Sequence, residues 1–392
     1  MNILFFTNEY AHPDLPAAGG VGSFLKTLAK EFTDNGHTIH VFGFSKKNKS
    51  FKEGKIQFHF FKKYSKSFPI SEGVRSITSR MNIKSAELYF LKKERKYLAN
   101  KLKKYAELNN IDIIESFVFN GYTAFWDNST PLVLRFHGSR GFWHYYLNQE
   151  KDELKISMEQ KALEATPYTV AVSNFSANAV KKIYSINVDK VIHNGIDHKL
   201  FSPIENIKKI PQSIFYFGTL SNAKGVDKLC QVFNQTIEEF PKASLHIIGR
   251  GNSYWENECQ DLLSKKALKS TKYYGPKNNN HLPKIISQAT ICIFATKNEN
   301  FSLAIEEAMA LKIPLIASNI EATEEIIDHK KNGFLANSIE DYLDYIKLLF
   351  KNDDLRKSIG DNARLKIQEK FTKEKMAQQT LDYYQEILAE KK

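Results

Sequence analysis

Residues 2–44 read NILFFTNEYAHPDLPAAGGVGSFLKTLAKEFTDNGHTIHVFGF, and this stretch decides the fold. The apolar run at 2–7 predicts a short buried strand, and the run at 38–44 predicts a second one. Between them, at 22–35, apolar side chains recur at the spacing of one helix face: Phe24, Leu25, Leu28, Ala29 and Phe32. This order predicts parallel strands, which require helices on both faces of their sheet.

The same alternation continues along the rest of the chain. Apolar runs predict strands at 112–117, 131–136 and 168–172, with a helix from about residue 174. Residues 194–212 carry two Pro, several Lys and no clear period, which is typical of a linker. After it we expect strands at 213–217, 244–248, 272–274, 291–295 and 314–317, alternating with helices at 225–240, 254–266, 282–287 and 303–310.

The pattern therefore predicts an α/β protein with two doubly wound, Rossmann-like domains that face each other across a cleft. We expect residues 1–203 to form the first domain and residues 204–370 the second. Residues 371–392 are expected to form a terminal helix, and an ordinary helix packed on its own domain is one interpretation of it. In open parallel sheets, ligands bind beyond the carboxyl ends of the strands, so the residues just after each strand are the candidates for a site.

Composition excludes several classes of protein. With 392 residues, 42% hydrophobic and 26% charged, the chain can build sizeable cores, which excludes a disordered or collagen-like chain. The apolar runs fall far short of the roughly 18 residues that a spanning helix needs, and no export signal is recognisable near Met1. We therefore expect a cytoplasmic protein. Three cysteines without CxxC spacing favour reduced thiols over a disulfide framework or a zinc site.

The net charge of +12 is concentrated in one segment. Residues 46–104 contain 18 Lys and Arg against four Glu, a balance of +14, so the remaining residues balance to about −2. Such a segment attracts polyanions. Because aromatic side chains lie among its lysines, we expect the segment to contact an anionic membrane surface or an acidic glycan. Contact with a membrane would be peripheral, at its inner face. The alternative is an idle, solvated face.

Two candidate features follow strands of the first domain. Gly19 and Gly20 lie where the first helix begins, and the backbone N–H groups there have no intrahelical partner and favour a negative group. About a dozen residues separate these glycines from the strand, which disfavours a nicotinamide-binding dehydrogenase and leaves a tight turn without ligand as the alternative. His137 directly follows the strand at 131–136. Its imidazole can form a hydrogen bond with a substrate hydroxyl or stabilise developing charge, and a purely structural role is the alternative.

Three further candidates follow strands of the second domain. Thr219 comes directly after one strand, and Lys224 stands just before the next helix. A lysine there adds a mobile cation to the helix dipole, a combination that suits a diphosphate, although a plain surface lysine is the alternative. Arg250 lies between Gly249 and Gly251 after another strand, where a ligand can approach the backbone closely.

The most informative stretch of the second domain is residues 299–310, which read ENFSLAIEEAMA. Glu299 places one carboxylate in the loop after a strand, and Glu307 places a second one about a turn and a half into the following helix. The N–H groups of the helix start lie between them, on Asn300, Phe301, Ser302 and Leu303. This arrangement can accept hydrogen bonds from hydroxyls at two points while amides hold a negative group in the middle.

Together, these motifs resemble the retaining glycosyltransferases of family 4, which have the two-domain GT-B fold. The resemblance covers nearly the whole chain in order and spacing. It rests on residues 19–22, 36–37, 137–138, 172–173, 194–197, 224–227, 249, 275, 299–310, 325–327 and 332–335.

The resemblance implies a role for each candidate residue. Glu307 would hold the ribose hydroxyls of a nucleotide-sugar donor, and Lys224 would neutralise its diphosphate. Glu299 and the amides after it would meet the sugar hydroxyls, His137 would lie near the transferred sugar, and the glycine loop of the first domain would close on the phosphates. The first domain would bind the acceptor, and the helix at 371–392 would cross back onto that domain. No DxD motif is present, so neither a metal nor another cofactor is expected.

The chain departs from the family pattern at two places. Thr219 stands where the family usually has arginine, so one of two cations expected at the diphosphate is missing, and Arg250 or Lys297 is a candidate to replace it. Asn300 and Ser302 stand where the family often has glycine, and their side chains are expected to narrow the sugar pocket. These changes concern the identity of the donor more than the reaction.

The expected function is metal-independent transfer of a hexose-type sugar, with retention, from a nucleotide donor to the hydroxyl of a glycan or lipid-linked acceptor. Synthesis of a cell-surface polysaccharide or glycolipid is the expected setting, and nucleic acid is not an expected partner. Two alternatives remain. One is a sugar-nucleotide epimerase of the same fold, which would convert a donor without any acceptor, and the other is a non-enzymatic polyanion-binding protein built around residues 46–104.

Overall fold

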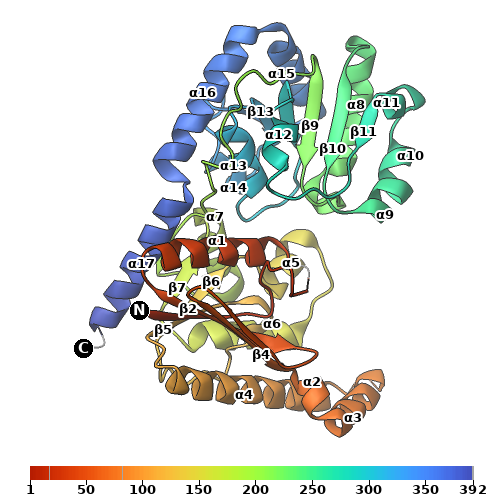
Figure 1. Ribbon diagram of the computed structural model, residues 1–392. Coiled ribbons are helices and arrows are strands. Elements are labelled where there is room, and N and C mark those ends of the chain that lie inside the picture. Colours follow the sequence, from red (N-terminus) through yellow and green to blue (C-terminus); the bar gives the residue numbers. More distant parts are fainter. Residues whose placement is uncertain (17, 82, 391–392) are drawn as a thin grey trace. The chain divides into compact units, whose positions relative to one another are not determined.

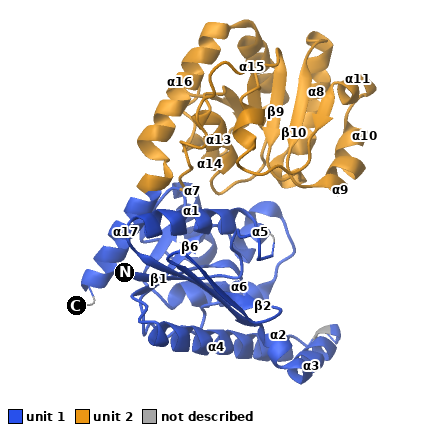
Figure 2. Cartoon of the chain, viewed as in Figure 1, with its two compact units in different colours: residues 1–193, 376–392 blue, residues 194–375 orange. Residues whose placement is uncertain are grey.

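The computed structural model describes residues 1–16, 18–81 and 83–390. It consists of two compact units, each built around its own β-sheet with helices on both faces (Figure 1). Unit 1 comprises Met1–His193 and Met376–Lys392, and unit 2 comprises Asn194–Lys375 (Figure 2). The predicted α/β architecture of two parallel-sheet domains is confirmed.

The structure divides the chain after His193 and after Lys375, rather than after residues 203 and 370. The reason at the first division is that the segment after His193 packs within unit 2. Ile196 lies against Thr372 as an isolated parallel bridge, and its carbonyl oxygen accepts a hydrogen bond from Lys373 N at 2.9 Å. A pattern of Pro and Lys does not reveal such contacts, because they join residues far apart in the sequence.

Unit 1 contains an eight-stranded sheet with the order β3-β4-β2-β1-β5-β6-β7-β8. All neighbouring strands are parallel except β3 and β4, which form an antiparallel hairpin at one edge. The strands are β1 (Asn2–Phe6), β2 (Thr38–Ser45), β3 (Lys49–Glu53), β4 (Ile56–Lys62), β5 (Ile113–Phe117), β6 (Leu132–Phe136), β7 (Thr169–Ala171) and β8 (Lys190–Val191). The carboxyl ends of β1, β5 and β6 therefore meet at one edge of the sheet.

Helices cover both faces of this sheet, with α1 on one face and α4 on the other (Figure 1). The helices are α1 (Gly20–Asp34), α2 (Tyr64–Ser67), α3 (Pro69–Arg80), α4 (Lys84–Leu108), α5 (Arg140–Leu147), α6 (Glu153–Glu164) and α7 (Asn174–Tyr184), with a short 3₁₀ turn at Phe119–Gly121. The apolar face that the sequence predicts for α1 is buried in the core of unit 1.

The C-terminal helix α17 (Lys373–Glu390) contributes to the core of unit 1. Its buried apolar side chains, which pack with those of β1, β2 and α1, are Met376, Ala377, Leu381, Tyr383, Tyr384 and Ile387. Residues 376–390 thus belong to the first unit although more than 180 residues of the second unit precede them in the chain.

The basic segment at 46–104 is structured in a way that charge alone does not predict. It forms the β3–β4 hairpin followed by α2, α3 and the 25-residue helix α4. Alternating lysines and aromatics obscure the strand period of the hairpin, and the lysine-rich exposed side of α4 obscures its apolar face.

Unit 2 contains a six-stranded, fully parallel sheet with the order β11-β10-β9-β12-β13-β14. Its strands are β9 (Ser213–Phe217), β10 (Ser244–Ile248), β11 (Thr271–Tyr273), β12 (Ile291–Phe294), β13 (Leu315–Ser318) and β14 (Phe334–Ala336). Its helices are α8 (Val226–Glu239), α9 (Asn252–Tyr254), α10 (Gln260–Leu262), α11 (Lys265–Lys269), α12 (Leu282–Ile286), α13 (Leu303–Ala310), α14 (Glu321–Glu324), α15 (Ile339–Lys351) and α16 (Asp353–Lys370).

The single helix predicted at 254–266 is wrong. The helical segment contains a π turn at Trp255–Cys259 and ends at Leu262, and a separate helix α11 begins at Lys265. Ser264 causes the break, because its hydroxyl accepts a hydrogen bond from Ala267 N at 3.2 Å and so acts as the N-cap of the new helix.

No helix within residues 1–16, 18–81 and 83–390 is long and apolar enough to cross a membrane. The three cysteines are buried and free, as expected from their spacing: Cys230, Cys259 and Cys292.

Candidate functional site

The loops that follow β9 and β12 lie directly against each other. Gly225 has a φ of 65°, in the left-handed region, and a Cβ atom there would lie 1.7 Å from Ala295 O. Thr296 Oγ1 donates a hydrogen bond to Ala223 O at 3.2 Å, and Lys297 N donates to the same oxygen at 3.0 Å. Only glycine fits at position 225, so this close approach depends on it.

Lys224 and Glu299 meet across these two loops. The Lys224 ammonium forms an ion pair with Glu299 Oε2, and the two side chains are 35% and 17% exposed. Lys224 is placed by a 3₁₀ turn that Ser221 caps. The structure therefore brings together, at the carboxyl edge of the sheet, a cation and a carboxylate that the sequence assigns to one site, and solvent reaches both.

The two cations expected to replace the missing arginine differ in their surroundings. Lys297 Nζ pairs with Asp227 Oδ2 at 2.7 Å, which holds its charge within the loop. Arg250 is exposed, and its carbonyl oxygen accepts a hydrogen bond from Leu220 N at 2.7 Å, directly beside the exposed Thr219. The Arg250 backbone thus lies beside Thr219, and replacement of the missing cation by Arg250 or Lys297 stays a prediction.

The start of α13 offers backbone groups rather than side chains. Phe301 is 6% exposed and packs edge-on against Phe371, with ring centroids 5.5 Å apart, and Ser302 is 8% exposed. Asn300 and Leu303 are partly exposed. Ser302 is therefore largely buried and Asn300 is not, and the narrowing of a sugar pocket by their side chains stays a prediction.

Two neighbouring glutamates of α13 have raised pKa values. Glu307 is partly exposed, and burial raises its pKa to about 8. Glu306 is fully buried, and neither of its carboxyl oxygens has a hydrogen-bond partner among the residues that the structure describes. Burial first, and then the charge of Glu307, raise the pKa of Glu306 well above its usual value. Glu306 was not singled out from the sequence. Its place between the apolar residues Ile305 and Met309 is the feature of the sequence that indicates a buried acid.

In unit 1, a side chain that sequence reasoning missed occupies the start of α1. Gly19 is the N-cap of α1 and Gly20 its first residue. Gly19 N donates a hydrogen bond to Glu9 Oε1, and Gly22 N donates to the same oxygen at 3.1 Å. The amides that were expected to meet phosphate oxygens thus hold a carboxylate of the same chain, and their contact with a phosphate stays a prediction.

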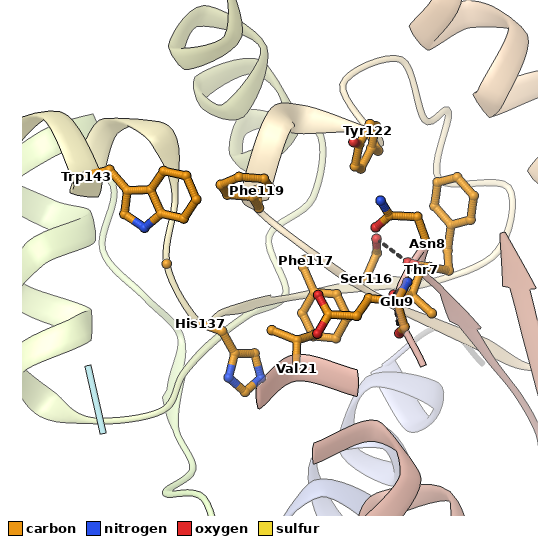
Figure 3. Close-up of a pocket in the computed structure, with 12 residues that line it drawn as sticks. Thr7, Asn8, Glu9, Val21, Ser116, Phe117, Phe119, Tyr122, His137 and Trp143 are labelled. Atoms are coloured by element: carbon orange, nitrogen blue, oxygen red, sulfur yellow. Dashed lines mark hydrogen bonds between the residues drawn. The ribbon is translucent and has the colours of Figure 1, made fainter. Parts of the chain in front are cut away.

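A cavity of about 220 Å³ opens at the carboxyl ends of β1, β5 and β6 (Figure 3). Its lining residues are Phe6, Thr7, Asn8, Glu9, Val21, Ser116, Phe117, Phe119, Tyr122, His137, Gly138 and Trp143. The rings of Trp143, Phe119 and Tyr122 lie along one side, and His137 lies next to Val21 on another (Figure 3). His137 and the glycine loop, predicted separately, therefore belong to neighbouring parts of one site.

His137 is held between two aromatic rings. Its centroid lies 4.5 Å from that of Phe24 and 5.3 Å from that of Phe117, with both pairs edge-on. Burial, and secondarily the charge of Arg135, lower the pKa of His137 to about 3. The imidazole is therefore neutral near pH 7.

A cation covers the aromatic side of this cavity. The Phe119 and Trp143 rings lie 4.8 Å apart, and the Arg140 guanidinium lies 4.9 and 5.1 Å from their centroids. Arg140 Nε donates to Asn120 Oδ1 at 3.1 Å, which fixes the guanidinium in place. The two ring planes are tilted by 58° to each other, and with the guanidinium beside them the rings form an apolar wall next to polar groups.

Within the described ranges 1–16, 18–81 and 83–390, no three His, Cys, Asp or Glu side chains gather closely enough to hold a metal ion. That a reaction at this site needs no metal stays a prediction.

Two family models match the chain and between them cover most of it. Residues 18–200 match the model described as Glycosyltransferase Family 4, and residues 197–366 match the model described as Glycosyl transferases group 1. N-acetyl-alpha-D-glucosaminyl L-malate synthase of Bacillus anthracis is 24% identical over 244 residues, which are 59% of this chain and 62% of that protein. The chain spans about half the length of the curated relatives it matches.

Solved structures share the fold over the whole chain. Sucrose-phosphate synthase of Thermosynechococcus elongatus has a TM-score of 0.78 at 16% identity, with 99% of each chain covered. Anabaena Alr3699/HepE, solved in complex with UDP and glucose, has a TM-score of 0.70 at 16% identity, with 97% of this chain and 98% of that chain covered. At these identities the likeness concerns the fold alone.

Proposed function

The chain belongs to glycosyltransferase family 4 and has the GT-B type of fold, and from this premise we propose that it transfers a sugar from a nucleotide-diphosphate donor to an acceptor hydroxyl. The observation that supports this most directly is the Lys224–Glu299 pair at the carboxyl edge of the unit 2 sheet. Beside it begins helix α13, whose first amides lack intrahelical partners. Cation, amides and carboxylates are the groups that a diphosphate sugar requires.

Unit 2 is the proposed donor site. Lys224 and the N-terminal dipole of α13 stabilise the negative charge that the leaving nucleoside diphosphate develops. Glu307 accepts hydrogen bonds from the ribose hydroxyls, and Glu299 exchanges its bond to Lys224 for bonds to the sugar hydroxyls when the donor binds. The transfer proceeds with retention and without a metal.

Unit 1 is the proposed acceptor side. The adjoining rings of Phe119 and Trp143, tilted by 58° to each other, present an apolar wall to the carbon–hydrogen face of a sugar ring. Asn8, Glu9 and Ser116 present polar groups in the same cavity, which bond the hydroxyls. We extend the proposal to a glycan or lipid-linked glycan acceptor, in the synthesis of a cell-surface polysaccharide or glycolipid.

His137 fits this scheme as a hydrogen-bonding group near the transferred sugar. With a pKa of about 3 it stays neutral, so it bonds a sugar hydroxyl without bringing a positive charge into the cavity. The positive field at the leaving group comes from Lys224 instead.

The test has two stages. A thermal-shift screen with UDP, GDP and ADP identifies the base, because a ligand that binds only the folded state raises the melting temperature. Wild type is then incubated with the matching nucleotide sugars, and release of nucleoside diphosphate is measured with and without glycan acceptors. The proposal expects acceptor-dependent release that is lost in Glu307→Ala and kept in Glu340→Ala, a matched change at an exposed glutamate of α15.

Two outcomes contradict the proposal. Full turnover in Glu307→Ala with unchanged donor affinity removes the assigned role of that carboxylate. Conversion of a donor sugar to its epimer in the absence of any acceptor indicates the epimerase instead.

A further inference from the structure

Helix α3 exposes a continuous apolar stripe. The stripe, here called the α3 ridge, consists of Ile70, Val74 and Ile77 of α3 and of Met81, which directly follows the helix and whose N donates a hydrogen bond to Ile77 O at 3.0 Å. The four residues follow one another at intervals of four, three and four, the spacing of one helix face. They are 85, 47, 60 and 66% exposed, respectively. Phe68, just before the helix, is 44% exposed. Exposed apolar side chains gathered on one face, unlike single ones, indicate an interaction surface.

The ridge is presented by an anchored element. Tyr64 of α2 is 7% exposed, and its ring lies 4.8 Å from Phe68 and 5.6 Å from Tyr97 of α4. The Tyr64 hydroxyl also lies 3.3 Å from Ser71 Oγ at the start of α3. These contacts hold α2 and the first turn of α3 on unit 1 while the ridge faces outward.

The surroundings of the ridge are basic. Residues 62–84 contain six Lys and Arg and one acid, Glu72. Glu72 lies within 3.5 Å of Arg75 and so is neutralised by its own helix. Lys84 pairs with Glu153 at 3.2 Å, and the other cations of the segment keep it positive. The segment therefore combines an apolar stripe with a positive charge.

We propose that α2 and α3 dock unit 1 onto an anionic lipid bilayer, with the α3 ridge inserted at the headgroup–acyl boundary and the basic side chains on the lipid phosphates. An amphipathic helix with a basic polar face lies in the plane of such an interface. The four aliphatic side chains distinguish this surface from a nucleic-acid site, where cations and aromatic rings form the contacts.

The position of α2 in the fold relates this surface to the cavity. The helix follows the carboxyl end of β4, which runs parallel to β2, β1, β5 and β6. The cavity opens at the carboxyl ends of β1, β5 and β6, so both features lie along one edge of the sheet. If the proposed acceptor-side function holds, a bilayer on α3 brings a lipid-linked acceptor to that edge; the docking itself does not depend on that function.

Vesicle co-sedimentation of the full chain tests the proposal. Vesicles of phosphatidylcholine alone are compared with vesicles that contain 30% phosphatidylglycerol, at low and high salt. We expect binding to the anionic vesicles only, weakened by salt. The double variant Ile70→Ser/Ile77→Ser should bind the anionic vesicles at least about tenfold more weakly. The reason is that burial of aliphatic side chains in the bilayer contributes strongly to the free energy of membrane binding. Lys66→Glu/Arg80→Glu should abolish the preference for anionic lipid.

Controls separate docking from damage to the fold. Leu348→Ser and Leu365→Ser change aliphatic residues that are 42 and 52% exposed on unit 2, and they should leave vesicle binding unchanged. All variants should keep the wild-type circular dichroism and melting temperature, since the altered side chains are exposed.

Three results overturn the proposal: no binding to anionic vesicles, equal binding to neutral ones, or wild-type binding by the ridge variant. Dimerisation that the ridge variant abolishes identifies the ridge as an interface between two copies, and tight RNA binding lost in the charge variant identifies a nucleic-acid site. Failure of docking leaves turnover of a soluble acceptor intact, whereas failure of the proposed transfer leaves vesicle binding intact, so the two are distinguishable.

Discussion

Arg135 and Glu115 form a bidentate ion pair in which both side chains are fully buried. Arg135 Nε lies 2.8 Å from Glu115 Oε1, and Nη2 lies 3.1 Å from Oε2. Helix α17 completes the network, because the Tyr384 hydroxyl donates to the Glu115 carboxylate and Thr380 Oγ1 accepts from Arg135 Nη2 at 3.1 Å. Helix α17 is thereby bonded to β5 through Glu115 and to β6 through Arg135. Arg135 is two residues before His137 in the chain.

We expect Arg135→Met to lower the free energy of unfolding by about 3–5 kcal/mol, because it leaves the Glu115 carboxylate buried without its cation. The paired variant Arg135→Met/Glu115→Leu should recover most of this loss, since it removes both charges. Urea unfolding followed by circular dichroism measures the difference.

Lys103→Met is the matched control, because Lys103 and Asp127 form a pair whose side chains are 43 and 48% exposed. Its effect on the free energy of unfolding should be much smaller than that of Arg135→Met, because water screens an exposed pair. Equal effects of Arg135→Met and Lys103→Met would contradict the importance assigned to the buried network.

Stability should depend on pH through His137. Its pKa is about 3 in the folded protein and about 6.5 when the chain is unfolded. Between these values the unfolded state binds a proton that the folded state does not, so stability falls as pH falls from 6.5 towards 3, by up to about 1.4 kcal/mol per pH unit. In His137→Gln this dependence should be less steep, whereas the exposed-site variant His281→Gln should behave as wild type. Identical slopes in all three proteins between pH 6.5 and 4.5 would refute the assignment.

Removal of the buried acid at Glu306 should stabilise the protein. Leucine has a similar size, and the variant Glu306→Leu relieves a carboxyl group that is fully buried without a hydrogen-bond partner among the described residues. We expect a gain of about 1–3 kcal/mol in the free energy of unfolding. Because the folded state holds this proton more tightly than the unfolded state, wild-type stability falls as pH rises above about 4.5, and the gain should grow in that direction.

Glu340→Leu, at an exposed position of α15, provides the comparison and should change stability by less than about 0.5 kcal/mol. A destabilised Glu306→Leu would mean that the acid has a bonding partner, such as a bound water, that offsets its burial.

The alternation of strands and helices was predictable because each element buries one periodic face. The β1–α1–β2 unit and the strands β9, β10, β12 and β13 follow that rule, and their apolar residues form the cores. The hairpin and helices at 46–104 were not predictable, because lysines on their exposed faces dominate the pattern. The break at Ser264 needed a local capping contact that outweighs the helical period.

One contact of the candidate site was predictable from the topology of the sheet. Lys224 and Glu299 are 75 residues apart in sequence, and the prediction that they meet rests on the carboxyl ends of neighbouring strands sharing one edge. Glu9 and Glu306 were missed, since their significance lies in contacts made or lacking in three dimensions. Neither the partner of the α1 amides nor the burial of one acid in α13 follows from spacing.

Lys224 and Lys297 permit a matched comparison of two lysines in neighbouring loops, each paired with a partly buried carboxylate. Lys224→Met removes the proposed diphosphate cation and leaves Glu299 as an uncompensated negative charge beside it. We expect binding of the nucleoside diphosphate found in the thermal screen to weaken by about 10- to 100-fold, since hydrogen bonds to charged groups contribute about 1.5–3 kcal/mol. Lys297→Met removes the cation beside Asp227 and should weaken binding by less than about threefold. This variant measures the effect of disturbing the loop alone. Isothermal titration of both variants, with melting temperatures as a check on folding, decides the matter. Equal weakening in the two variants would assign Lys224 a structural role and would leave the charge of the diphosphate to Arg250 and the α13 amides.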